Sequence, residues 1–322
     1  MPRMRSPRQG SMQYWPRSRA SDIVARIRTW PAVKDQKVLG FAGYKVGMTH
    51  IFIKDNAPNS MTKGDEISVP VTVLECPPIK VAGVMAYRHD AYGSHCVGQI
   101  FTDKLDKEVS RRLPVPKKAQ KPFDPKDISD VRILVYTQPS STGIGKKTPE
   151  VFELGVGGAN PKDRFAFAQT LLGKEVKISD VFSNGMIVDS VSVTKGKGLQ
   201  GPVKRHGIAL RSHKSEKTKR GPGSLGPWHG FRGWRTPHQG QMGFQQRLEH
   251  NKQIILIGDD VSKINPAGGF MRYGVVKNQY LLVKGSLGGA VRRLVKLTVP
   301  RRIVPKIKEA PQVTYVSLAS KQ

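Results

Sequence analysis

Basic side chains, glycines and aromatic rings are interleaved over residues 194–252, and this combination has the chemistry to bind a folded polyanion. Only Glu216 and Glu249 oppose the basic residues of the segment, which are Lys195, Lys197, Lys204, Arg205, Arg211, Lys214, Lys217, Lys219, Arg220, Arg232, Arg235, Arg247 and Lys252. Lysine and arginine neutralise phosphates, glycine lets a backbone approach closely, and exposed rings stack on unpaired bases. The segment is therefore typical of a protein part that enters folded RNA.

Three large aromatic residues, Trp228, Phe231 and Trp234, distinguish this segment from an ordinary disordered tail. Disordered chains are poor in such residues, while the aliphatic residues needed for a separate core are scarce here. We therefore expect no stable shape until an outside partner orders the segment. Turn-forming neighbours favour Trp228 as a ring presented at the tip, with a local folding anchor as the alternative; Trp234 suits the anchor better.

The same segment holds most of the histidines of the chain, namely His206, His213, His229, His238 and His250. A metal site needs ligands at short, regular spacing with cysteines or acids among them, and neither is present. Two interpretations stay open: these imidazoles contact RNA, or they are exposed bystanders.

Gly196, Gly198 and Gly201 fit the G-x-G-x-x-G pattern of dinucleotide sites. Such a site needs a helix that begins at once, and we predict none, because Pro202 and Gly207 enclose only a short basic run. Glycine-permitted approach to an RNA backbone explains the pattern better.

Two further motifs fail in detail. Residues 140–148 resemble a phosphate-binding P-loop but lack its first glycine and the serine or threonine after its lysine. The Gly-Asp-Asp at 258–260 has no second acidic strand and is predicted as a turn. No nucleophile elbow occurs either. We therefore expect no catalytic residue, no metal and no cofactor.

The charge balance indicates a polyanionic partner. The chain has 322 residues, with 54 Lys and Arg against 24 Asp and Glu, a net charge of +30 that would repel itself in one compact body. No apolar run approaches the roughly 20 residues that span a bilayer, and no secretory apolar region begins the chain. Two cysteines, Cys76 and Cys96, make no disulfide framework. These features favour a cytoplasmic protein.

Residues 1–36 are predicted to form an extended basic arm. Its first twenty positions contain no acid but carry the arginines Arg3, Arg5, Arg8, Arg17 and Arg19. Trp15 and Trp30 are the expected points of attachment. Ser21 predicts a short amphipathic helix over 22–30.

The rest of the chain alternates as many short strands do, which predicts a mainly β protein: a closed β-barrel with α+β insertions. Pro70 favours an edge position, and helices are expected at 102–113 and 160–172, the second with Phe165, Ala168, Thr170, Leu171 and Leu172 on its buried side. Strands are expected at 38–53, 67–76, 79–88, 131–138, 150–154, 186–194, 253–258, 272–276, 280–286, 291–299 and 312–318. The predicted parts are the arm (1–36), the first barrel part with the inserted region (37–193), the basic loop (194–252) and the second barrel part (253–322).

Six motifs follow one another along nearly the whole chain: PRQGSMQYWPRSRA, GFAGYKVGMTH, VTKGKGLQGPVKRHG, GSLGPWHG, GQMGFQQRLEHNK and GGFMRYGVVKNQYLLVKGSLGG. Together they resemble the universal ribosomal protein L-three family of the large subunit, in its archaeal form. The long C-terminal extension of the eukaryotic form is missing, and the insertions exceed those of the bacterial form. Lys219 stands near the place of the modified histidine of the eukaryotic form, so that modification is not carried over.

The resemblance implies a six-stranded barrel of the type shared with translation elongation factors. It also implies an N-terminal arm and a central loop, the tryptophan finger with Trp228 at its tip, that enter rRNA toward the peptidyl transferase centre. The family binds near the 3′ end of 23S rRNA, nucleates assembly of the 50S subunit and influences A-site accommodation, beside ribosomal proteins L-fourteen and L-twenty-four-e. The expected rRNA contacts are the cations named above together with Lys45, His206, Trp228, His229, Trp234, Gln241 and Lys284.

Two other classes of protein remain as alternatives. An RNA-modifying enzyme would use the barrel and basic loop for docking and would need cofactor-dependent activity, with Asp259 and His206 as the residues to test. A nucleoid-compacting protein would bind duplex DNA as tightly as RNA.

Overall fold

The computed structural model describes residues 10–11, 13–57, 59–103, 105–114, 128–214, 218–223, 225, 236–302 and 310–319. The chain divides into two compact units. The first, called here the extension unit, comprises Met1–Asp22 and Val193–Gln246; the second, the body unit, comprises Ile23–Ser192 and Arg247–Gln322. The extension unit thus combines the N-terminal arm with the central basic segment.

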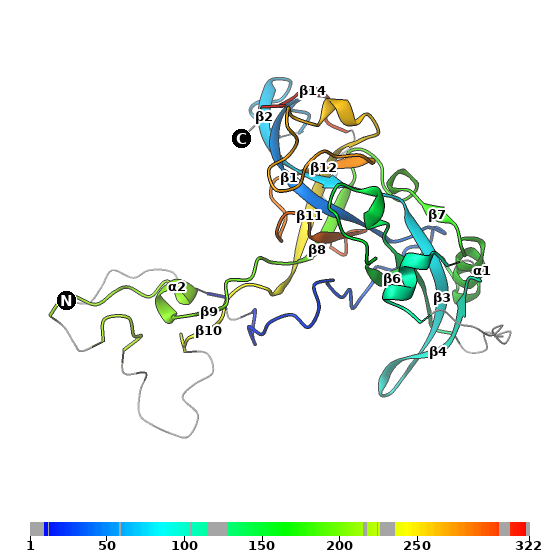
Figure 1. Cartoon of the computed structure of the whole chain (residues 1–322), viewed down its shortest axis with the longest axis horizontal. Helices are drawn as coiled ribbons and strands as arrows, with labels where there is room; N and C mark the ends of the chain where they lie inside the picture. Colours follow the sequence, from blue (N-terminus) through cyan, green and yellow to red (C-terminus); the bar gives the residue numbers. More distant parts are fainter. Residues whose placement is uncertain are drawn as a thin grey trace. The chain divides into compact units, whose positions relative to one another are not determined.

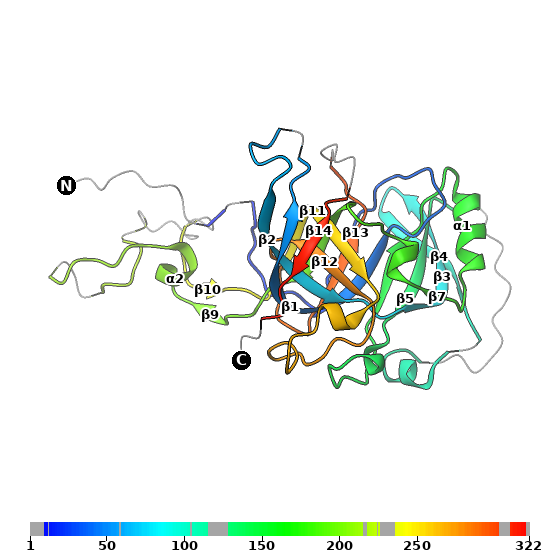
Figure 2. The same cartoon turned by 90° about the horizontal axis from the view of Figure 1, so that it is seen from above.

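Six strands of the body unit close into a ring. The order is β13 (Leu294–Thr298), β8 (Ile187–Val193), β11 (Gln246–Gly258), β12 (Tyr280–Lys284), β2 (Glu66–Glu75) and β1 (Gly40–Lys54), and β13 also pairs with β1 (Figures 1 and 2). The far half of β1 pairs instead with β14 (Val313–Val316). The predicted mainly β class is confirmed. That this ring is of the elongation-factor type stays a prediction.

Short runs of β-branched and other apolar residues explain why these segments are strands, since β8 and β13 are buried along their whole length. Phe41, Ile51, Val73 and Leu281 are all fully buried, and each such side chain contributes about 1.5–3 kcal/mol relative to an exposed one. The same apolar cluster continues into the second sheet. The body unit therefore has one continuous core.

Pro70 is not at an edge, because β2 lies between β12 and β1. The β12 ladder ends where Lys284 pairs with Val71, so the missing N–H of Pro70 falls one residue beyond it. The carbonyl of Pro70 still accepts a hydrogen bond of 2.8 Å from the Gly285 N–H. A proline is thus tolerated inside a central strand where one neighbouring ladder has stopped.

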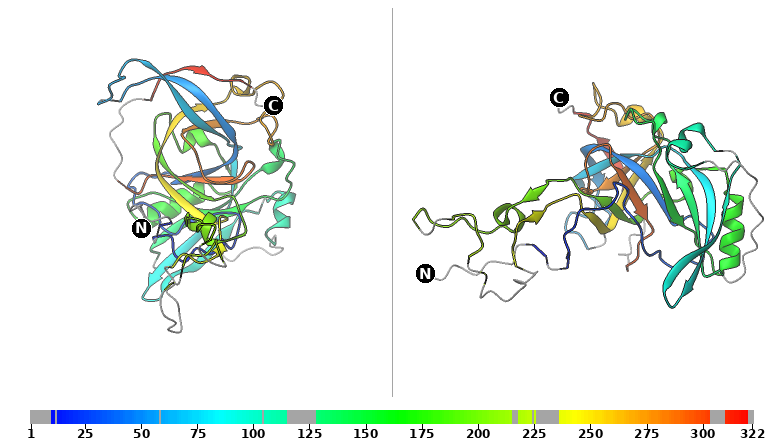
Figure 3. Two further views of the ribbon diagram at one scale, coloured as in Figure 1. Left: turned by 90° about the vertical axis from the view of Figure 1, so that its left-hand side faces the viewer. Right: turned by 60° about the horizontal axis from the view of Figure 1, so that its bottom comes forward.

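A second sheet lies beside the ring. Its order is β4 (Gly93–Phe101), β3 (Ile79–Asp90), β5 (Asp130–Tyr136) and β6 (Val151–Gly155), and β7 (Glu175–Val176) pairs with β3. Helix α1 (Pro161–Thr170) lies along this sheet against β5 and β3 (Figures 2 and 3). Strand β4 was not predicted, because most of its side chains are exposed and no burial pattern marks it.

The helix predicted at 160–172 is confirmed with two differences. Asn160 holds the N-cap position, but its amide donates to the Asp163 carboxylate at 3.1 Å rather than bonding the helix backbone. Thr170 is exposed, so the buried side is formed by Phe165 and Ala168, with Leu171 and Leu172 partly buried. Gly173 follows with a φ of +74°, the left-handed conformation that ends helices.

Two predicted helices are wrong in part or whole. Residues 22–24 form bends and residues 25–30 form no helix; Ala25 and Ile27 are buried while Arg26 and Arg28 are exposed, a period of two that fits an extended chain. Within 102–113 only a 3-10 helix, Lys107–Arg111, forms, and Val109 is its one buried residue. Three more 3-10 helices connect strands of the body unit: Pro139–Ser141, Ile178–Asp180 and Val261–Lys263.

The strand predicted at 272–276 is also absent: side chains bind the end of this segment and the residues after it, and Asn265 Oδ1 accepts a hydrogen bond from Val276 N at 2.9 Å. Glu75, fully buried, accepts hydrogen bonds from Lys277 N (2.9 Å), Asn278 N (3.0 Å) and Asn278 Nδ2 (2.8 Å), and from the Tyr273 hydroxyl. Burial and then the Glu75 charge raise the pKa of Tyr273 well above its ordinary value, so its hydroxyl stays a donor. A buried carboxylate thus shapes the segment.

In the extension unit, β9 (Leu199–Gln200) and β10 (Gly240–Gln241) form a two-stranded sheet beside the short helix α2 (Pro202–His206) (Figure 1). Gly207, with a φ of +63°, ends α2 in the left-handed conformation. The prediction that this segment has no structure of its own is therefore wrong for its base.

Candidate nucleic-acid interface

Backbone hydrogen bonds join the two limbs at the base of the basic segment. Lys197 N donates to Met242 O (2.9 Å), Met242 N to Gly198 O (2.9 Å) and Phe244 N to Lys195 O (3.2 Å). Gly243 has a φ of +72°, and a Cβ there would lie 2.0 Å from the Lys195 carbonyl oxygen, so the close approach requires glycine. The pairing leaves the side chains of Lys195 and Lys197 exposed.

Trp15 attaches the N-terminal arm to this base, as its composition predicted. Its ring stacks on His206, with centroids 6.2 Å apart and planes 12° apart. The guanidinium carbons of Arg17 and Arg205 lie 5.6 and 5.9 Å from its centroid, within cation–π range. Ala20 N also donates to Phe244 O at 2.8 Å. The arm and the segment therefore form one folded base.

Arg205 supports this base from within. Its Nε donates to Gln241 O at 3.1 Å and its Nη1 to His238 O at 3.0 Å, so one side chain ties α2 to the returning limb. Burial lowers the pKa of Arg205, although an arginine stays charged at neutral pH. A Cβ at Gly240 would lie 3.0 Å from the Arg205 guanidinium carbon, so glycine makes room for it.

Several predicted RNA contacts have internal roles instead. His206 is 3% exposed, so neither interpretation of its imidazole holds: it is neither open to RNA nor an exposed bystander. Gln241 donates to the Gly243 carbonyl at 3.0 Å. Lys45 is buried in the body unit, and its ammonium donates to the Leu287 carbonyl at 2.5 Å. His250 bonds Asp189 at 2.8 Å. Side chains of these types often contact RNA at a protein surface, but here their contacts stabilise the fold.

Other predicted contacts are exposed and have no acidic partner among the described residues. In the extension unit these are Arg19, Lys195, Lys197, Lys204, Lys214, Lys219 and Arg220. Asp22 is the one acidic side chain in the described part of that unit. Phosphates are the natural counterions for such a surface, because a polyanion neutralises many cations at once.

The remaining predicted contacts are divided between the units. Arg17, Arg205 and Arg211 are half-buried in the extension unit. In the body unit, Lys284 is exposed, Arg247 is half-buried, and the Lys252 ammonium lies 3.1 Å from Glu249. Nine predicted contacts lie outside the described residues: Arg3, Arg5, Arg8, Lys217, Trp228, His229, Arg232, Trp234 and Arg235.

A helix does follow the G-x-G-x-x-G pattern, contrary to prediction. It is the five-residue α2, whose last turn carries Lys204, Arg205 and His206. The preceding strand β9 pairs antiparallel with β10 in its own two-stranded sheet, whereas a dinucleotide fold has a parallel sheet there. The pattern therefore belongs to the folded base of the segment.

No three His, Cys, Asp or Glu residues gather as potential metal ligands in the part of the chain that the structure describes. None of the helices described there is long and apolar enough to cross a bilayer.

Sequence reasoning did not single out three arginines of the body unit, Arg28, Arg132 and Arg164. They line one cavity although they come from distant segments. Since no motif or spacing joins them, only the fold could have found them.

Comparison with known proteins identifies the family of this chain. The family model of ribosomal protein L3 matches residues 1–322. The large ribosomal subunit protein uL3 of Methanothermobacter thermautotrophicus is 43% identical, with 100% of this chain and 99% of the relative covered. The uL3 proteins of Methanobrevibacter smithii and Archaeoglobus fulgidus are 45% and 44% identical, over 100% and 98% of this chain and 99% and 98% of their own lengths. The chain therefore belongs to the ribosomal protein L3 family and is a structural constituent of the large ribosomal subunit.

Proposed function

We propose that the chain is a primary rRNA-binding protein, which binds 23S rRNA near its 3′ end and nucleates assembly of the subunit. The observation that carries this proposal is the extension unit, where exposed cations gather around a single described acid. Within one protein such a surface repels itself, and RNA phosphates remove that repulsion.

The proposed mechanism couples folding to binding. The base built on Trp15, His206 and Arg205 is already ordered and gives the arm and the segment fixed starting points. Beyond that base, phosphates order the chain as they bind. In this mechanism the segment extends toward the peptidyl transferase centre, and the body unit, as a barrel of the elongation-factor type, contacts neighbours such as ribosomal proteins L-fourteen and L-twenty-four-e.

Salt dependence tests the proposal. Binding of the full chain to a 23S rRNA transcript is measured between 50 and 200 mM salt, and six to ten phosphate contacts predict a loss of roughly 10³- to 10⁵-fold in affinity. Duplex DNA of equal charge serves as the competitor. A flat salt dependence, or equal affinity for duplex DNA, would contradict rRNA as the partner.

Trp228 provides a second test, based on its position in the family motif. Trp228→Ala is expected to leave rRNA affinity nearly unchanged and to slow A-site accommodation in assembled subunits, because one tip ring contributes little to the total phosphate contact. Loss of assembly would instead make Trp228 a folding anchor.

A further inference from the structure

A cavity of about 290 Å³ lies in the body unit, beside the second sheet. The extended segment that includes Arg28 and Trp30 forms one wall; strands β3 to β6 and α1 supply the others. Its lining includes three arginines, Arg28, Arg132 and Arg164, but one carboxylate, Asp130. The volume is close to the lower end of small-ligand sites, which suits a group the size of one nucleotide.

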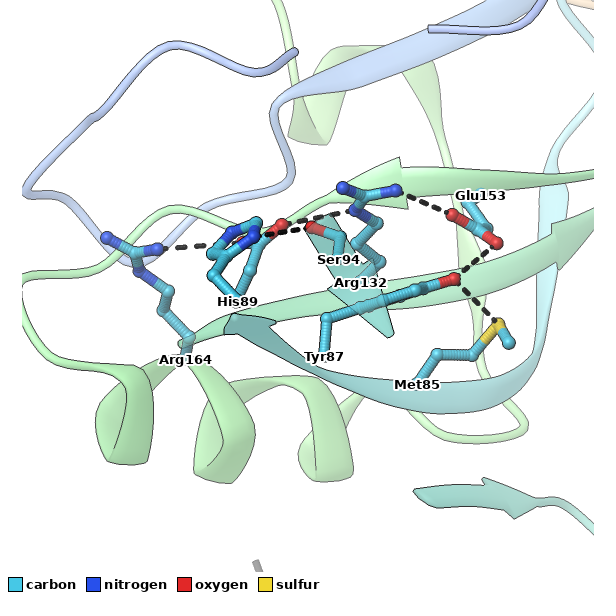
Figure 4. A network of polar contacts seen from close by, with 8 residues as sticks. Met85, Tyr87, His89, Ser94, Arg132, Glu153 and Arg164 are labelled. Atoms are coloured by element: carbon cyan, nitrogen blue, oxygen red, sulfur yellow. Dashed lines mark hydrogen bonds and ion pairs between the residues drawn. The ribbon is translucent and has the colours of Figure 1, made fainter. Parts of the chain in front are cut away.

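Arg132 is held rigidly at this cavity. Its Nε donates to Asp130 Oδ2 at 3.1 Å and its Nη1 to Glu153 Oε2 at 3.0 Å. Its guanidinium carbon lies 4.5 Å from the centroid of the Tyr87 ring, and the Tyr87 hydroxyl donates to Glu153 at 2.7 Å (Figure 4). The Nη2 group has no hydrogen-bond partner among the described residues. A pre-ordered donor therefore remains for a ligand.

Asp130 also holds the second arginine. Its Oδ1 lies 3.7 Å from Nη1 of Arg164, whose Nε donates to Gly158 O at 2.9 Å. One carboxylate thus keeps two guanidinium groups close together despite their mutual repulsion. Asp130 and Glu153 together balance Arg132 and Arg164, so the net positive charge that favours a bound anion comes from Arg28.

Arg28 and Trp30 complete the wall from the extended segment. Arg28 is exposed and has no side-chain partner in the described structure. The Trp30 indole lies against Gly155, where a Cβ would come within 2.6 Å of the ring. Glycine there lets the ring pack flat on the strand. The exposed Arg28 side chain and the packed Trp30 ring therefore both belong to this wall of the cavity.

We propose that this cavity holds one backbone phosphate of an RNA strand, with Arg28, Arg132 and Arg164 as its donors. Planar guanidinium groups match phosphate oxygens two at a time, and Trp30 offers a flat surface to the adjoining ribose or base. This site belongs to the body unit and is additional to the arm and basic segment. It rests on the proposed rRNA-binding function.

Arg28→Gln tests the site with little risk to folding, because Arg28 makes no described side-chain contact. Arg88→Gln is the matched control: Arg88 is also exposed, on β3 beside the cavity residue His89, but it does not line the cavity. With a 23S rRNA transcript, Arg28→Gln is expected to lower affinity roughly tenfold and the salt slope by about one, while Arg88→Gln changes neither.

The outcomes separate this site from the proposed function. If both variants bind like the wild-type chain, or lose affinity equally, the phosphate site is overturned while rRNA binding stands. If the wild-type chain itself shows no salt-dependent binding, both proposals fail. If Arg28→Gln binds rRNA normally but enters large-subunit particles poorly, the cavity takes an acidic group of a neighbouring protein and the RNA assignment is wrong.

A direct measurement uses inorganic phosphate as the probe. The chain has four tryptophans, so the indole N–H signals in a nitrogen–proton NMR spectrum are few, and Trp30→Phe identifies the one from Trp30. Titration is expected to shift the Trp30 signal in the wild-type chain and much less in Arg28→Gln. Equal shifts in both chains would overturn the site.

Discussion

The cationic side chains of the two units differ in their acidic partners. In the body unit, Lys80 lies 3.0 Å from Asp106 and 3.6 Å from Glu175, and Lys146 pairs with the buried Glu150. In the described part of the extension unit, seven exposed cations share one acidic side chain, Asp22. Paired charges tolerate burial and help define a fold, whereas unpaired charges need an external counterion. We therefore assign the paired charges of the body unit to folding and the exposed cations of the extension unit to binding.

The units differ in apolar packing as well. Strands of the body unit bury Phe41, Ile254 and Leu282 completely. In the described part of the extension unit, Leu199 is 70% exposed and Leu210 is 52% exposed, and the Trp15 indole stacks on the His206 imidazole. The described residues of this unit therefore have no apolar core like that of the body unit.

Glu75→Ala is expected to give the largest effect and to act only on the body unit. The substitution leaves the buried Tyr273 hydroxyl and the part-buried N–H groups of Lys277 and Asn278 without an acceptor, which costs about 3–5 kcal/mol of unfolding free energy. Urea unfolding measures the loss. Asp65→Ala, an exposed change at the start of the same strand, should stay within about 0.5 kcal/mol. If the two variants are equally stable, the buried, hydrogen-bonded Glu75 contributes no more to folding than the exposed Asp65, and the assignment of paired charges to folding is wrong.

Replacing Lys195, Lys197 and Lys204 together by glutamine is expected to weaken rRNA binding and to leave the stability of the body unit unchanged. The unfolding free energy of the body unit should change by less than about 0.5 kcal/mol, because these side chains are exposed. The salt slope of rRNA binding should fall by about 2–3, one phosphate contact for each cation.

The matched control replaces three exposed lysines of the body unit, Lys162, Lys174 and Lys177, by glutamine. The change in net charge is the same, but the slope should barely move. If both triple variants lower the slope equally, affinity follows total charge and the extension unit has no special role.

Trp15→Ala is expected to have the smallest and most local effect. Loss of the ring uncovers His206 and removes two cation–π contacts, about 1–2 kcal/mol in total. Hydrogen exchange of the Arg205 amide, which donates to Gly201 O at 3.0 Å, should become roughly ten times faster, while the melting of the body unit stays unchanged. Trp15→Phe should restore much of the protection. A lowered melting temperature of the body unit would contradict the independence of the two units.

Sequence patterns predicted most elements of the body unit, because the apolar side chains that form its core also mark where its strands lie. Most strands were found from short runs of branched and other apolar residues, and α1 from its proline, its acid and its closing glycine. Errors arose where tertiary contacts override local preference. Residues 22–30 have helix-forming signals, yet Ala25 and Ile27 pack on the core as an extended chain.

Composition predicted the nature of the binding surface but not the role of each residue. The count of cations was visible, whereas the burial of Lys45 and His206 depends on neighbours far along the chain. The cavity of Arg28, Arg132 and Arg164 was invisible for the same reason. Its donors become a group only when an extended segment, a strand and a helix meet.

The pairing of β1 has a consequence for how the chain folds as it is synthesised. Gly40 of β1 pairs with Thr298 of β13, so the ring cannot close until β13 has left the translating ribosome. At about 5–20 residues per second, β1 and β2 wait roughly 10–50 s with unsatisfied edges. The charged segment that precedes β11 is complete well before then, so like-charge repulsion between newly made chains guards the open strands while they wait.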